Sequence, residues 1–179
     1  HGGQWGAPVT TIAQIIDHRP LSGLQIRVFV LCALVVLIDG YDLQAMGLAL
    51  PALSKEWGLP FSSFGWVVAA SLIGVGIGSA FVAPLGDRWG RRPMLLIGVV
   101  LIGCSSLATI LSTDLNHLIA WRILTGIGLG VCQSNATALT AEYAPLRRRA
   151  MLMTLMGCNV AFGALIAGLV APWLIQHYS

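Results

Sequence analysis

The chain has 179 residues, of which 56% are hydrophobic and only 9% are charged, and its mean hydropathy is +0.82. Soluble domains carry about 25% charged residues, and a soluble core of this size could not bury so much apolar surface. The composition therefore excludes an ordinary soluble domain, and the formal charge of +3 is too small to indicate a nucleic-acid partner.

Five apolar stretches follow one another along the chain, separated by short polar breaks. A helix needs about 20 apolar residues to cross a bilayer, and each stretch is close to or above that length. The sequence therefore predicts an all-α membrane protein, with a cytoplasmic segment at 1–27 and the start of an extracytoplasmic loop at 176–179. The five predicted spans are about 28–50, 63–85, 94–112, 118–141 and 151–175.

The positive charges predict the orientation of these spans. Eight of the ten cations flank alternate breaks and so lie on one face, whereas Lys55 is on the other face and Arg122 is within the fourth span. Short loops rich in Lys and Arg stay in the cytoplasm, which places the N-terminus inside, in the cell inner (plasma) membrane. The eight are Arg19, Arg27, Arg88, Arg91, Arg92, Arg147, Arg148 and Arg149.

The first predicted span contains two carboxylates, Asp39 and Asp42, in an otherwise apolar run. A charged carboxylate at the bilayer centre costs roughly 2.5–3.5 kcal/mol, so such residues usually line a polar path. Three residues of helix turn through about 300°, which places both acids on one face. Two neighbouring carboxylates repel each other, and one of them becomes a usable proton carrier. This pattern indicates a proton-coupled membrane transporter.

Glycines with four-residue spacing occur in two predicted spans. This spacing lets the backbones of membrane helices approach closely, so we expect these residues to pack helices together rather than to bind a nucleotide. The pairs are Gly74 and Gly78 in the second span, and Gly126 and Gly130 in the fourth.

The arginine-rich face carries carboxylates as well as cations. The loop after the second span holds Asp87, Arg88, Gly90, Arg91 and Arg92. The break after the fourth span runs from Glu142 to Arg149, with Pro145 ending the helix between them. A signal that only sets topology would not need both signs of charge, so we expect a cytoplasmic gating contact built from ion pairs.

These features resemble the major facilitator superfamily. Residues 87–92 match its signature between the second and third spans, with Ala83 in place of the leading glycine. Arg122 and the glycines that follow it match the fourth-span signature, and 142–149 resembles the motif after that span. The resemblance implies a fold of twelve spans in two six-span halves, each half made of two inverted repeats. The chain would then be the N-terminal five spans, a fragment of the first six-helix half, and would lack the second half of the transporter.

Within that superfamily, the run Asp39-Gly40-Tyr41-Asp42 resembles the first-span motif of the aromatic acid:proton symporter family. The resemblance implies uptake of benzoate-type or hydroxybenzoate-type carboxylates together with protons. It also implies that Asp39 and Asp42 line the cavity and couple the proton, and that Arg122 is an essential cation. The proton gradient would supply the energy, without a cofactor or a metal.

The positions of the charges along their helices predict that two of them meet. Asp42 follows Arg27 by about 22 Å of helix, counted from the inner surface. Arg122 lies about 7–8 Å below the outer end of its span, which in a core about 30 Å thick is again about 22 Å above the inner surface. We therefore expect Asp42 and Arg122 to exchange partners: Arg122 pairs with ionised Asp42, and takes a substrate carboxylate when Asp42 is protonated.

Two alternatives remain open on sequence alone. Other symporters of the superfamily, for sugars or organic cations, share the loop motifs, and two acids with one cation could serve a cationic substrate. A membrane fragment or partner subunit that does not transport is the second alternative. An enzyme is not expected, because the sequence offers no Ser/His/Asp set, no metal-ligand cluster and no phosphate-binding loop.

Overall fold

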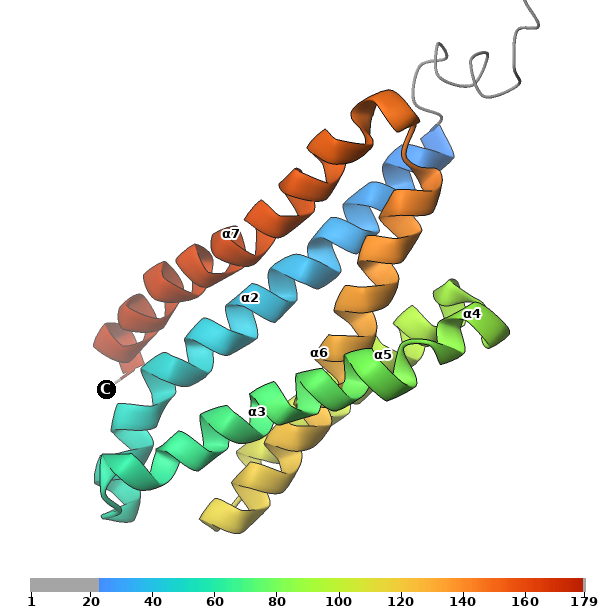
Figure 1. The fold of residues 1–179 in the computed structure, drawn as a ribbon. Helices are drawn as coiled ribbons and strands as arrows, with labels where there is room; N and C mark the ends of the chain where they lie inside the picture. The colour runs from blue at the N-terminus through green and yellow to red at the C-terminus, as the bar shows by residue number, and fades with distance from the viewer. Residues whose placement is uncertain (1–22, 179) are drawn as a thin grey trace, which may run out of the picture.

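A computed structural model describes residues 23–178, and these residues form a bundle of long helices joined by short turns (Figure 1). Most of the predicted segment 1–27 and the last residue of 176–179 lie outside the described residues. The elements in chain order are α2 (Gly23–Trp57), the 3₁₀ helix η1 (Phe61–Phe64), α3 (Gly65–Ile77), the π-helix η2 (Gly78–Val82), α4 (Leu85–Trp89), α5 (Arg91–Ile110), α6 (Leu115–Tyr143) and α7 (Leu146–Tyr178).

Four helical segments of the described part are long and apolar enough to cross a membrane. They are Phe61–Val82, Arg91–Ile110, Leu115–Tyr143 and Arg147–Val170. These four segments overlap the last four predicted spans, whereas the first predicted span, 28–50, lies within α2 and stays a prediction. Helices α2, α6 and α7 continue past both predicted ends, because hydropathy marks only the apolar stretch while backbone hydrogen bonding extends into polar residues such as Lys55. By contrast, α3 begins at Gly65 and α5 ends at Ile110, inside their predicted spans.

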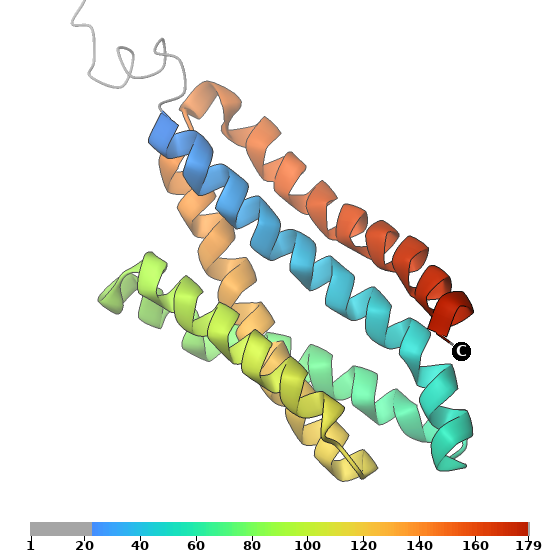
Figure 2. The ribbon, with the colours of Figure 1, turned by 180° about the vertical axis from the view of Figure 1, so that it is seen from behind.

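Helix α6 is the centre of the bundle. Helices α3 and α5 both pack along it, α2 crosses it, and α7 packs along α2 on the other side (Figures 1 and 2). Half of the most apolar stretch of α6 is buried, against 17–28% for the other three candidate spans. Residues of α6 are therefore the ones placed to contact several helices at once.

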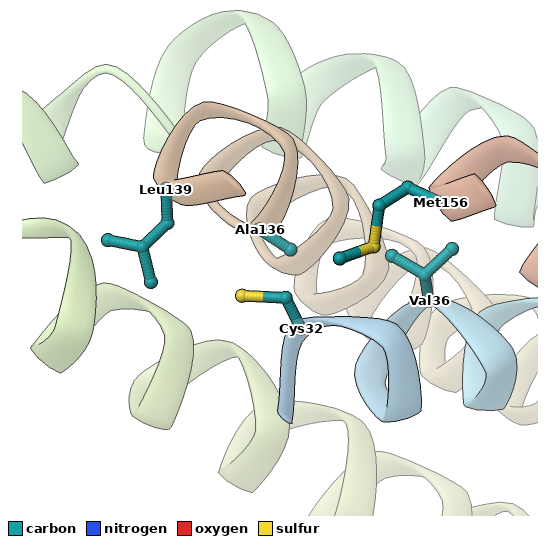
Figure 3. Close-up of a cluster of buried hydrophobic side chains, with 5 residues drawn as sticks. All are labelled: Cys32, Val36, Ala136, Leu139 and Met156. Carbon is teal, nitrogen blue, oxygen red and sulfur yellow. The ribbon is translucent and has the colours of Figure 1, made fainter. Parts of the chain in front are cut away.

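Apolar clusters hold the long helices together, and two of them include buried residues of α2. One joins α2, α6 and α7 (Figure 3) and consists of Cys32, Val36, Ala136, Leu139 and Met156. The other lies towards the opposite end of α2 and consists of Met46, Leu50, Phe64, Val67 and Leu118. Many large apolar side chains face outward instead, among them Trp66, Phe81 and Leu107, as expected where the solvent is hydrocarbon.

Candidate functional site

Asp42 of α2 and Arg122 of α6 form an ion pair where their helices cross. Arg122 Nη1 donates to Asp42 Oδ2 over 2.8 Å. The Arg122 side chain is 8% exposed and that of Asp42 is 17% exposed, so water screens the pair only weakly. The structure thus brings together the two groups that the depth calculation placed at one level.

Arg122 keeps hydrogen-bonding capacity beyond this pair. Its Nε is buried and has no hydrogen-bond partner among the described residues. A guanidinium presents five N–H donors in a planar fork. The donors that Asp42 leaves open could bind a second acceptor, and a carboxylate fits the fork because its two oxygens can accept two parallel N–H bonds. No sequence pattern predicts this open donor, because it depends on how the Arg122 side chain lies between the two helices.

Asp39 lies one helical turn before Asp42 and is not part of the ion pair. The residue is 6% exposed, and within residues 23–178 it forms no hydrogen bond or ion pair. Its carboxylate is within electrostatic range of Asp42 and of Cys132 on α6. The two predicted acids therefore sit in different surroundings, one paired with a cation and one buried without a partner.

Helix α7 holds the backbone of this acidic segment. A Cβ placed on Gly40 would overlap the backbone carbonyl of Val160, and a Cβ on Gly163 would overlap that of Leu37 and lie 2.8 Å from the amide nitrogen of Tyr41. No pattern of small residues on α2 predicts this contact. Gly163 and Ala167 on α7 do have the four-residue spacing of small residues, and both are buried.

The predicted glycines bring α3 and α6 into the same kind of contact. A Cβ on Gly74 would lie 3.0 Å from Gly126 Cα and would overlap the carbonyl oxygen of Ile123. Farther along, a Cβ on Gly78 would overlap the carbonyl of Ile127. Gly130 faces α3 and η2 in turn: a Cβ there would overlap the carbonyl oxygen of Val75 on α3 and lie 2.8 Å from the amide nitrogen of Ser79 on η2.

The arginine-rich end of the bundle contains a second polar site, which we call the latch: residues 83–91 with Glu142. Arg91 pairs with Asp87 over 3.0 Å and, through its Nε, with Glu142 over 2.7 Å. The neighbouring Arg92 donates to the Tyr143 hydroxyl over 3.2 Å. Gly90 separates α4 from α5 with a φ of 96°, a conformation that favours glycine.

Two predicted latch residues are not brought into it. Arg88 and Arg149 are exposed and form no ion pair within the described part of the chain. Glu142, which precedes Arg149 by seven residues, turns to Arg91 of the other loop instead. The two predicted loop motifs therefore meet through the ion pair of Arg91 with Glu142 and the hydrogen bond from Arg92 to Tyr143.

Comparison with known proteins places this geometry in context. The chain is 43% identical over 167 residues to the 4-hydroxybenzoate transporter PcaK of Pseudomonas aeruginosa, covering 93% of this chain and 37% of that protein. It is 40% identical over 163 residues to a gallate transporter of Pseudomonas putida, covering 91% of this chain and 36% of the relative. The chain thus spans little more than a third of the length of these curated relatives.

The fold is also found among solved structures. The proton:xylose symporter XylE bound to 6-bromo-6-deoxy-D-glucose superposes with a TM-score of 0.78 at 24% identity, over 89% of this chain and 39% of XylE. At that identity the likeness concerns the fold alone. The family model described as Major Facilitator Superfamily matches residues 32–179. With most of its length matched by that model, this all-α chain belongs to the Major Facilitator Superfamily.

Proposed function

We propose that this chain is the N-terminal part of a transporter that takes up an aromatic carboxylate, of the benzoate or hydroxybenzoate type, together with protons. The observation that carries the proposal is the buried Arg122, which is paired with Asp42 and has a further donor, Nε, that meets no acceptor among residues 23–178. The relatives that share 40–43% identity are named as transporters of 4-hydroxybenzoate and gallate, both aromatic carboxylates.

The ion pair supports a mechanism that couples proton and substrate. While Asp42 is ionised it occupies one edge of the Arg122 guanidinium. Protonation of Asp42 removes the negative charge and frees that edge, so that a substrate carboxylate can bind the fork in a bidentate pair. Proton and anion then enter together with no net charge left unpaired, which avoids the cost of an isolated charge in the membrane. Asp39, which lies a turn away and has no hydrogen-bond or ion-pair partner in the described part of the chain, relays the proton onward.

The latch contributes the gate in this proposal. The Arg91 contacts to Asp87 and Glu142 close one end of the bundle, and their breakage and re-formation accompany the change of access. By the positive-inside rule this end faces the cytoplasm of the inner membrane, together with the N-terminus. The second half of the transporter supplies the other wall of the path, and the proton gradient is the only energy source.

Uptake measurements test the proposal. In cells that make the longest protein containing this sequence, radiolabelled 4-hydroxybenzoate should accumulate, and a protonophore should abolish the accumulation. Excess unlabelled benzoate should compete, whereas excess xylose should not. Competition by xylose but not by benzoate would favour the sugar alternative, for which the likeness to XylE offers no support beyond the fold.

A further inference from the structure

Asn135 of α6 contacts the turn that begins the latch. Its side chain is almost fully buried, with 1% of the residue exposed. The Nδ2 group donates to Val131 O over 2.9 Å on its own helix and to Ala83 O over 3.5 Å across the interface. Gly86 N–H also donates to Ala83 O, over 2.9 Å. One carbonyl thus joins Asn135 to the turn that carries Asp87.

Gly86 lies directly against this amide. A Cβ placed on Gly86 would overlap Asn135 Oδ1 and lie 3.1 Å from Asn135 Cγ. The Oδ1 atom is buried and has no hydrogen-bond partner among the described residues. A buried amide oxygen without a donor costs free energy. We therefore expect the Asn135 side chain to add little to the stability of the fold and to act mainly by holding the turn at Gly86 in place.

The same face of α6 contacts the latch a second time. Glu142 follows Asn135 by seven residues, which is two helical turns and therefore the same side of the helix. There it accepts the 2.7 Å hydrogen bond from Arg91. Residues 83–91 of the latch are thus attached to α6 at two places. One is the buried, uncharged contact with Asn135, and the other is the half-exposed ion pair with Glu142.

We propose that Asn135 is a positioning residue for the latch. By contacting Gly86 and Ala83 it fixes where residues 83–91 lie along α6, which we call the register, and this register lets Arg91 reach Glu142. Any effect of Asn135 on the rate of uptake rests on the gating role proposed above. Its effect on the position of residues 83–91 does not depend on that role. Salt screens the exposed ion pair but not the buried amide contact, so the register persists at high ionic strength.

Hydrogen exchange in the purified, longest protein containing this sequence tests the register. Asn135→Ala should speed exchange of the latch amides by up to about fivefold, the factor for one typical hydrogen bond, because its bond to Ala83 O is long at 3.5 Å. Gly86→Ala should speed it as well, because the added methyl group pushes against the amide. In the double variant the amide is gone and the methyl group has room, so exchange should be no faster than in Asn135→Ala alone. Two effects that multiply would overturn the proposal.

A matched control and a second readout keep the result clear. Gly76→Ala, on α3 with nothing within 4 Å of its Cβ, should leave latch exchange unchanged. If Gly86→Ala does not fold, unchanged latch exchange in Asn135→Ala is by itself enough to overturn the proposal. In uptake assays Asn135→Ala should lower the maximum rate with little change in KM. Altered exchange with unaltered uptake would support the positioning role and count against the gating role of the latch.

Discussion

At the scale of single residues, Arg122 is the group on which the proposed transport depends most. Its planar fork can hold two carboxylate oxygens at once, whereas a lysine ammonium is a point charge. We therefore expect Arg122→Lys to lower uptake of 4-hydroxybenzoate at least tenfold, the effect of losing about 1.4 kcal/mol of binding at the fork. The reverse exchange at an exposed cation, Lys55→Arg, is the matched control and should transport normally. Normal uptake by Arg122→Lys would contradict the role of the fork.

The partner of Arg122 has a different expected phenotype. Asp42→Asn removes the proton-carrying group but leaves a side chain of the same shape beside the guanidinium. Because the fork then stays free at every pH, exchange of labelled for unlabelled substrate should continue while proton-driven accumulation is lost. Both are measured in the same proteoliposomes, with and without an imposed pH gradient. Full accumulation by Asp42→Asn would shift the coupling role to Asp39.

The latch ion pair gives a third residue-scale prediction. Glu142 is about half exposed, and ion pairs of this kind are worth about 0–1 kcal/mol, so Glu142→Gln should change the thermal stability little. It should nevertheless alter uptake, because the ion pair with Arg91 is one of the contacts that join the two motifs. Arg91 also pairs with Asp87, so the charges are exchanged in an Asp87→Asn background. There, Arg91→Glu with Glu142→Arg should recover part of the rate lost in either single variant. A double variant no better than either single variant would show that the attraction between them is not what matters.

At the scale of helices, the packing of α2 against α7 sets a strict size limit. A methyl group added at Gly163 would overlap the backbone of α2 rather than a side chain that could move aside. We expect Gly163→Ala to destabilise the protein by about 1–3 kcal/mol, the usual cost of overpacking. Gly157→Ala is on the same helix, has nothing within 4 Å of its Cβ and should be neutral. Thermal unfolding in detergent compares the two.

Helix-scale features also divide into those that the sequence predicts and those that it does not. Hydropathy locates the long helices because each must present an apolar surface to lipid, and the four-residue spacing of Gly74 and Gly78 predicts that their helix packs closely against another. The spacing does not predict that the partner is α6. The contact at Gly40 escaped prediction because α2 offers a single small residue there, without a repeat. The change from α3 to the π-helix η2 at Gly78 also escaped prediction, because hydropathy does not distinguish a π-helix from an α-helix. The predicted span 63–85 also runs past Pro84, where a turn separates η2 from α4.

The same division holds within the candidate site. Depth along two helices predicts that Asp42 and Arg122 meet, because helix rise is fixed and both distances start from marked ends. Which carboxylate pairs with Arg91 could not be predicted, since several arginines and acids lie at one end of the bundle. Rotation of each helix about its own axis decides that choice, and rotation depends on side-chain packing across the whole interface.

At the scale of the whole molecule, the bundle consists of two closely packed units. One unit is formed by α2 and α7, and the other by α3, α5 and α6. Backbones in direct contact at glycines cannot slide past each other without a clash, so each unit is expected to move as one body. Helix α2 crosses α6 between them, and there the Asp42–Arg122 pair joins the units. Protonation of Asp42 would therefore weaken an ion pair that holds the two units together.

That ion pair has a consequence for how the protein is made. Arg122 is synthesised 80 residues after Asp42, which at about 5–20 residues per second is a delay of roughly 4–16 s. During this interval α2 can already be in contact with the membrane, while its acidic segment has no cation to meet. The nascent helix must therefore wait at the translocation channel, or enter lipid with its carboxylates protonated. Once α6 is inserted, Arg122 can pair with Asp42, and we expect this pairing to stabilise α2 in the membrane.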